Sequence, residues 1–145
     1  MRHLKLLGLL AGLLLLSAFA AGCSSTAAAE GDLAMAPAAD LPAAVRGAPL
    51  VVREAYQFAV ANPDVLQEIP CYCGCVAMGH TSNYSCYVDS AAPGDNVVFD
   101  GHALGCSICV DITQDTMRLL QQGKSVADIH AYVDQRYSQY GQPTN

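Results

Sequence analysis

The residues with chemically reactive side chains are concentrated in one short stretch. Residues 70–75 read Pro-Cys-Tyr-Cys-Gly-Cys, so three thiols fall within five positions. Three more cysteines and two histidines follow within the next 34 residues. The eight candidate donors are Cys71, Cys73, Cys75, His80, Cys86, His102, Cys106 and Cys109. Thiolate and imidazole are the ligands that bind zinc, copper and related ions, whereas hard cations prefer oxygen.

This donor set predicts a metal site formed by all eight residues. A tetrahedral zinc site needs only four ligands, and thiolates can bridge several Cu(I) ions. The excess of donors therefore favours Cu(I) at more than one equivalent, with zinc as the alternative ion. No catalytic residue and no organic cofactor is predicted, so we expect a binding protein rather than an enzyme.

Two other interpretations of the thiols remain open. Cysteines spaced C-x-C-x-C do not readily bond to each other. In an exported domain they could form three disulfides, pairing the three motif cysteines with Cys86, Cys106 and Cys109. Alternatively, Cys106-Ser-Ile-Cys109 at a helix start fits a thiol–disulfide oxidoreductase, because the helix dipole lowers the pKa of the first thiol.

Helical periodicity predicts the elements that flank the motif. Residues 49–61 carry apolar side chains at helical spacing, behind a proline that suits the first turn of a helix. A second, short helix is expected over residues 62–69, where Asn-Pro marks its start and Pro70 its end. The motif follows directly, as a loop.

A third helix is predicted from about residue 103 to Gly123. Separations of four and three residues would place His102, Cys106 and Cys109 on one face of it, as a tripod opposite the motif loop. A last helix is expected after Ser125, where Ser-Val-Ala-Asp resembles a capping box. The tail after Tyr140 is expected to fray.

Between the motif and the third helix, the sequence predicts a small hairpin. Residues 86–88 and 97–99 are rich in residues typical of strands, and residues 93–96 read Pro-Gly-Asp-Asn, which favours a turn. The predicted fold class is therefore mainly α: a small domain of three to four helices with a short β-hairpin insert. We expect this thiol-rich domain over residues 46–141, with residues 142–145 as a tail.

The N-terminal region predicts export and lipid anchoring. Residues 1–22 combine a positive start, an apolar run of 14 residues and a small-residue site, which is typical of a bacterial signal peptide. The cleavage site resembles a lipobox, so Cys23 is expected to become the acylated first residue. Residues 23–45 are rich in Ala, Ser, Gly and Pro and are expected to form a flexible tether. The predicted location is the extracytoplasmic face of the cell membrane, with the membrane as partner through the lipid on Cys23.

Charge argues against one class of partner. The net charge of −6 becomes −8 once Arg2 and Lys5 leave with the signal peptide. A chain with so few basic residues offers no patch for phosphates, so nucleic acid is not expected as a partner. No particular protein partner is indicated by the sequence.

With these residues in view, the chain resembles the bacterial lipoproteins named after their PCYCGC motif. The resemblance covers about residues 62–140 and rests on short sequence runs. These are the motif itself, Gly-His-x-Ser-Asn at 79–83, Cys86, Gly-His at 101–102, the C-x-x-C at 106–109 and Gly-Lys-Ser at 123–125. It implies an exported, lipid-anchored domain with a thiol-rich site. The last two helices also look like the end of the thiol reductases of cytochrome c maturation, whose redox C-x-x-C lies further upstream.

Overall fold

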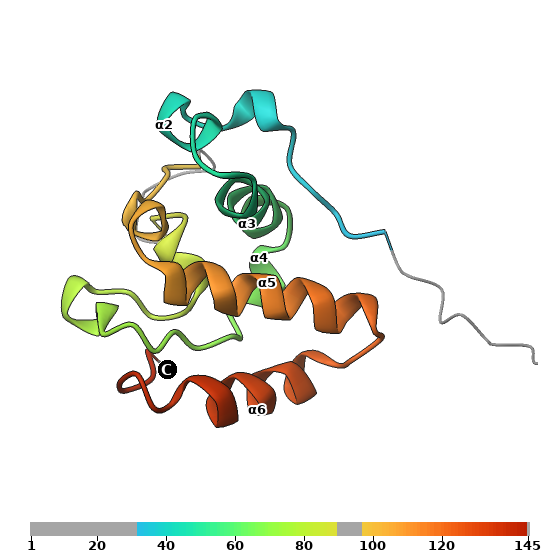
Figure 1. Cartoon of the computed structure of the whole chain (residues 1–145), viewed down its shortest axis with the longest axis vertical. Coiled ribbons are helices and arrows are strands. Elements are labelled where there is room, and N and C mark those ends of the chain that lie inside the picture. Colours follow the sequence, from blue (N-terminus) through green and yellow to red (C-terminus); the bar gives the residue numbers. More distant parts are fainter. Residues whose placement is uncertain (1–31, 90–96, 145) are drawn as a thin grey trace, which may run out of the picture.

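Helix α3 (Leu50–Ala61) forms one wall of the core in the computed structural model, which describes residues 32–89 and 97–144 (Figure 1). The helix starts after Pro49, whose missing N–H costs nothing in a first turn. Its buried face includes Ala55, Tyr56 and Phe58. The helix predicted over residues 49–61 is thereby confirmed.

The chain between α3 and the motif is more irregular than predicted. Helix α4 (Pro63–Leu66) is a single turn and ends before Ile69. Asn62 stands at its N-cap position, but the Asn62 side chain donates to the carbonyls of Ala34 and Phe58 at 2.8 Å instead of accepting from the helix. Asn62 therefore ties α3 to the segment that precedes it.

Helices α5 (Ser107–Gln121) and α6 (Val126–Tyr137) form the other side of the domain, with α6 running back along α5 (Figure 1). Gly123, with φ of 74°, takes the left-handed conformation that ends α5. The Ser125 hydroxyl accepts from the Asp128 N–H at 3.2 Å, so the predicted cap is confirmed.

A single carboxylate joins these two helices. Asp115 on α5 accepts from the hydroxyls of Tyr132 and Tyr137 on α6, at 3.1 and 2.8 Å. It also pairs with Arg118 at 2.7 Å and Arg136 at 3.2 Å. Burial acts to raise the pKa of Asp115, but the hydrogen bonds from Arg118 and the tyrosines outweigh it and lower the pKa.

Part of the predicted tether belongs to the folded domain. After a 3₁₀ turn η1 (Ala38–Asp40), helix α2 (Ala43–Arg46) packs against α3, and Leu41 and Val45 are buried. The tether boundary at residue 45 is therefore too late. A run of small residues lacks the periodicity from which this packing could be predicted. The predicted signal peptide, Cys23 and the first part of the tether lie outside the described residues.

The predicted β-hairpin insert is not seen. Within the described residues there is no strand, and only an isolated antiparallel bridge joins Val88 to Phe99. Two backbone hydrogen bonds flank it, Asp89 N–H to Val98 at 2.8 Å and Asp100 N–H to Tyr87 at 2.9 Å. Cys86 belongs to a 3₁₀ turn, η3 (Tyr84–Cys86), so the first segment is too short to extend the pairing. The predicted turn at 93–96 lies outside the described residues.

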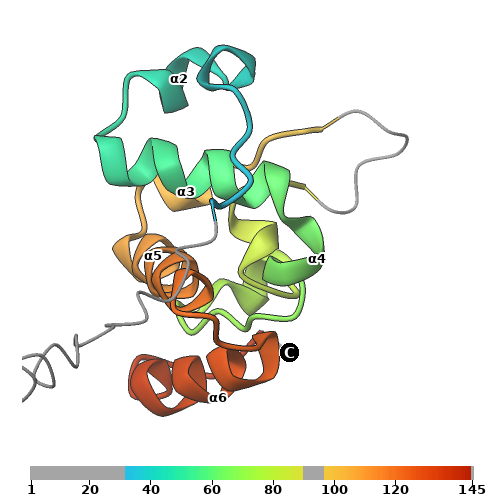
Figure 2. The same ribbon diagram turned by 90° about the vertical axis from the view of Figure 1, so that its right-hand side faces the viewer.

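The donor-bearing loops lie between α3 and α6, beside α5 (Figure 2). They contain two further 3₁₀ turns, η2 (Cys75–Met78) and η4 (His102–Leu104). Four cysteines are buried within the hydrophobic core itself: Cys71, Cys75, Cys86 and Cys109. Among residues 32–89 and 97–144, no helix has the length and apolar character needed to cross a bilayer.

Candidate metal centre

The motif loop is held by its own aromatic residue and turned by its glycine. Tyr72 is buried, and its hydroxyl donates to Asp134 on α6 at 2.6 Å. Gly74 has a φ of 83°, a conformation that side chains other than glycine rarely adopt. The turn at Gly74 directs Cys73 and Cys75 to different partners, although only one residue separates them.

Three sulfurs form a nearly equilateral triangle. The Sγ atom of Cys71 lies 3.4 Å from that of Cys73 and 3.5 Å from that of Cys109, and the Cys73–Cys109 distance is 3.5 Å. Two corners come from the motif loop and the third from the first turn of α5. The triangle therefore exists only because the loop packs against the start of that helix.

The remaining donors extend the cluster on both sides. The Sγ atoms of Cys75 and Cys86 lie 3.9 Å apart. On the other side, His102 Nε2 lies 3.3 Å from Cys73 Sγ. All these sulfur–sulfur distances exceed the roughly 2.05 Å of a disulfide, and the six described cysteines are free thiols.

A carboxylate holds the two histidines. Asp100 Oδ1 accepts from the His102 backbone N–H at 2.7 Å, and Asp100 Oδ2 lies 3.4 Å from His80 Nε2. The two imidazole rings meet edge to face, with centroids 5.2 Å apart. The Nδ1 atom of His80 is buried and has no partner among the described residues. His80 thus has a carboxylate beside one ring nitrogen, and its other ring nitrogen is free to bind an ion. Metal-binding histidines commonly show this arrangement.

The predicted tripod on one helix face is wrong, although its three donors do meet. His102 lies on η4, Cys106 is the extended N-cap residue of α5 with φ of −120° and ψ of 102°, and only Cys109 lies within the helix. Helical spacing across the 3₁₀ turn suggested one continuous helix. The bend at Gly105 and Cys106 brings the donors together instead.

A buried polar network fixes the first turn of α5. The Cys109 carbonyl accepts from Asn83 Nδ2 at 3.2 Å and from the Tyr87 hydroxyl at 2.8 Å. Thr113, one turn later, donates to Asn83 Oδ1 at 2.6 Å. These positioning residues were not predicted from the sequence, although Asn83 lies in the Gly-His-x-Ser-Asn run. They set the position of Cys109, and with it one corner of the sulfur triangle.

The C-terminal segment closes over the motif instead of fraying. Thr144 exchanges two hydrogen bonds with the Cys71 backbone. A Cβ atom at Gly141 would lie 2.9 Å from the Tyr72 carbonyl oxygen, so only glycine allows this approach. The tail predicted at residues 142–145 is thus, as far as Thr144, part of the site. No pattern within a short stretch of sequence predicts a contact between residues as far apart in the chain as Cys71 and Thr144.

The donors form three overlapping groups of four, each with all ligand atoms within 4.8 Å of one another. These groups are Cys71, Cys73, Cys86 and Cys109; Cys73, His102, Cys106 and Cys109; and Cys73, Cys75, Cys86 and His102. Cys73 belongs to all three. Seven of the eight predicted donors therefore come together, and His80 stands beside them through His102 and Asp100.

The thiols influence one another's ionisation. Hydrogen bonds from Cys109 and Cys86 lower the pKa of the Cys71 thiol. Burial, together with contacts to Cys75 and Cys71, raises the pKa of Cys73. Once one thiolate has formed, its charge opposes the next ionisation. A cation in the cluster would supply the charge that lets several thiolates coexist.

Most of the chain matches a family model. A family model described as "Protein of unknown function with PCYCGC motif" matches residues 13–145. No curated protein and no solved structure matches significantly.

Proposed function

This chain belongs to the family of proteins with the PCYCGC motif, and we propose that its Cys/His cluster binds soft d10 metal ions, Cu(I) in preference to zinc. The observation that carries the proposal is the triangle of Cys71, Cys73 and Cys109, whose edges measure 3.4, 3.5 and 3.5 Å. Sulfurs placed about 2.3 Å from an ion at tetrahedral corners lie about 3.8 Å apart. Small side-chain adjustments would therefore complete coordination.

The composition of the cluster favours copper. Three overlapping groups of four donors share thiols, and Cys73 is common to all of them. Cu(I) accepts few ligands and is bridged by thiolates, whereas zinc prefers one closed tetrahedron. A shared thiol is an advantage for bridged Cu(I) ions and has no use in a single zinc site.

The proposed place of action is the outer face of the cell membrane. It rests on the signal-like residues 1–22 and on Cys23 as the residue that would carry the lipid. A lipid anchor would keep the domain close to membrane proteins that use or export copper. In this setting the protein would hold or deliver copper without transforming a substrate.

Anaerobic titration of the purified chain with Cu(I), against a colorimetric competitor, tests this function. We expect more than one equivalent to bind. Cys73→Ser should lose most of this capacity, because Cys73 belongs to every group of donors. His130→Gln is the matched control, since His130 pairs with Asp134 on α6 at 3.3 Å and belongs to no donor group among the described residues. Uptake of one zinc without competitive Cu(I) binding would refute the copper assignment.

The thiol–disulfide alternative predicts a different covalent state. Three disulfides would make the anaerobically purified chain six hydrogens lighter than its reduced form and leave no thiolates for an ion. A reductase pair would also exchange with small thiols, which a structural disulfide resists. Mass measurement together with elemental analysis distinguishes these outcomes from metal binding.

A further inference from the structure

We propose that the cluster comprises a closed inner site and an open outer site, and that Cys106 is the thiol through which copper passes to a thiol-bearing acceptor. This inference rests on the proposed function and assigns different roles to the two sites: the inner site stores copper and the outer site transfers it. It concerns two of the donor groups, which share Cys73 and Cys109.

The inner site lies in the core of the protein. Its members are Cys71, Cys73, Cys86 and Cys109, and all except Cys73 are buried. The C-terminal segment covers Cys71 through Thr144, and the Asn83 network fixes Cys109. Any incoming ligand would have to displace this packing, so the inner site is expected to release its ion slowly.

The outer site is made of more accessible donors. Here Cys71 and Cys86 are replaced by His102 and Cys106, and three of its four members are only half-buried. The His102 backbone is fixed by its N–H, which donates to Asp100, and the His102 Nε2 atom already lies 3.3 Å from Cys73 Sγ. An ion held there would be reachable by a second protein.

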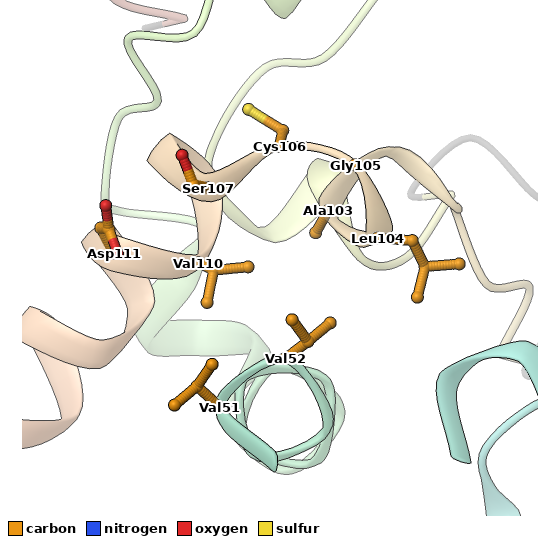
Figure 3. A pocket seen from close by; sticks show the side chains of 9 residues that line it. All are labelled: Val51, Val52, Ala103, Leu104, Gly105, Cys106, Ser107, Val110 and Asp111. Atoms are coloured by element: carbon orange, nitrogen blue, oxygen red, sulfur yellow. The ribbon is translucent and has the colours of Figure 1, made fainter. Parts of the chain in front are cut away.

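Cys106 is the thiol that belongs to the outer group alone, and it is half-buried. It lies on the bend between η4 and α5, with exposed residues Gly105 and Ser107 on either side. The bend borders a pocket of about 290 Å³ with an apolar floor that includes Val51 and Val52. Figure 3 shows the Cys106 sulfur directed away from these two valines. The pocket therefore does not receive the Cys106 sulfur, and the exposed residues beside Cys106 leave room for an approaching chain.

The transfer is a ligand exchange without a change in oxidation state. The acceptor thiol loses its proton and its sulfur forms a bond to Cu(I), while the bond from Cu(I) to Cys106 breaks. The released Cys106 thiolate takes up a proton. Further acceptor thiols then displace Cys73, Cys109 and His102 from the ion. Each thiol that binds gives up one proton, each released cysteine thiolate takes one up, His102 leaves as a neutral imidazole, and the remaining proton passes to solvent. Cys73 and Cys109 can keep their bonds while the ion moves from the inner pair of ligands to the outer pair. The two shared thiols thus link storage to delivery.

Stopped-flow transfer from the copper-loaded full chain to an excess of a thiol chelator tests the inference. The wild type should release copper in a fast phase, from the outer site, and a slow phase, from the inner site. In Cys106→Ser the fast phase should disappear and the slow phase should become slower, because copper from the inner site also leaves through Cys106. Serine is a favourable N-cap residue, so this variant is expected to fold. Cys86→Ser is the matched inner variant, and it should lose the slow phase and keep the fast one.

Circular dichroism of each variant verifies folding before the transfer is measured. A single release phase in the wild type would overturn the division into two sites. Loss of both phases in folded Cys106→Ser, or of neither, would overturn the role of Cys106. Failure of the wild type to bind Cu(I) in the equilibrium titration would instead refute the proposed function, so the two failures are distinguishable.

Discussion

Thr144 and Cys71 are joined by two hydrogen bonds although 73 positions separate them in the chain. The Cys71 N–H donates to Thr144 Oγ1 at 2.9 Å, and the Thr144 N–H donates to the Cys71 carbonyl at 3.1 Å. The pair fastens the end of the protein to the first cysteine of the motif.

Thr144→Val should lower the free energy of unfolding by about 1 kcal/mol, because it removes the acceptor for the Cys71 N–H and keeps the shape of the side chain. Chemical denaturation measures the change. The exposed neighbour Gln142 provides the control, and Gln142→Ala should stay within about 0.5 kcal/mol of wild type. Equal losses in both variants would mean that the hydrogen bond contributes nothing specific.

Gly141→Ala should destabilise the domain by about 1–3 kcal/mol, since the new methyl group would meet the Tyr72 carbonyl oxygen at 2.9 Å. Thermal unfolding of the metal-free protein is the measurement. Gly105→Ala is the comparison, because no atom lies within 4 Å of a Cβ built there. A Gly141→Ala protein as stable as Gly105→Ala would show that the tail does not hold its place over the motif.

Asp100→Asn should weaken Cu(I) binding by about 10–100-fold, because Asp100 Oδ2 lies 3.4 Å from the His80 imidazole and Asp100 Oδ1 accepts from the His102 backbone N–H, and carboxylate partners of metal-binding histidines contribute to that extent. Competitive titration gives the affinity. Asp111→Asn removes the same charge from an exposed position on α5 and should leave the affinity unchanged. If Asp100→Asn and Asp111→Asn bind Cu(I) equally weakly, the loss of affinity comes from the change in net charge and not from the contacts of Asp100 with the histidines.

Asp115 makes stability depend on pH. Its pKa is lowered in the folded state, so its contribution is fully present above the ordinary carboxyl pKa of about 4 and is lost as the pH falls through the lowered value. Asp115→Asn should therefore cost about 1 kcal/mol at neutral pH and progressively less in acid. Denaturation curves at several pH values test this. If the loss of stability in Asp115→Asn does not vary with pH, the loss comes from altered packing and not from the charge of the Asp115 carboxylate.

Metal should stabilise the fold, because four of the donors are also core residues. At Cu(I) concentrations 100-fold above the dissociation constant, the free energy of unfolding should rise by about 2.7 kcal/mol. Anaerobic calorimetry with and without a chelator measures the change. A transition that copper leaves unmoved, in a protein that binds it, would show equal affinity for the folded and unfolded chain.

Much of the helical frame follows from local sequence. Proline before α3, the left-handed Gly123 after α5 and the Ser125 cap of α6 act within a few residues of where they stand. Apolar spacing then identifies the buried faces. The types and number of candidate donors are also local information, which is why the thiol-rich character was evident before the fold.

The site geometry was decided by contacts that no local pattern contains. Cys109 meets Cys71 across 38 positions, and Tyr72 meets Asp134 across 62. The break before α5 also depends on how η4 packs, so spacing alone suggested one long helix. Similarly, residues 32–45 and the C-terminal segment are held by contacts with distant elements, through burial of Leu41 and Val45 and through the hydrogen bonds of Thr144.

The sequence by itself thus determined which donors are present and where most of the longer helices lie, because residue type and short-range periodicity act within single elements. The tertiary structure alone decided that Cys73 is common to three groups of donors, that Cys106 belongs only to the half-buried group and that Asp100 contacts both histidines. These relationships arise when the motif loop, the bend before α5 and the end of the chain pack against one core. Such packing depends on the combined burial of side chains far apart in sequence, which no single stretch encodes.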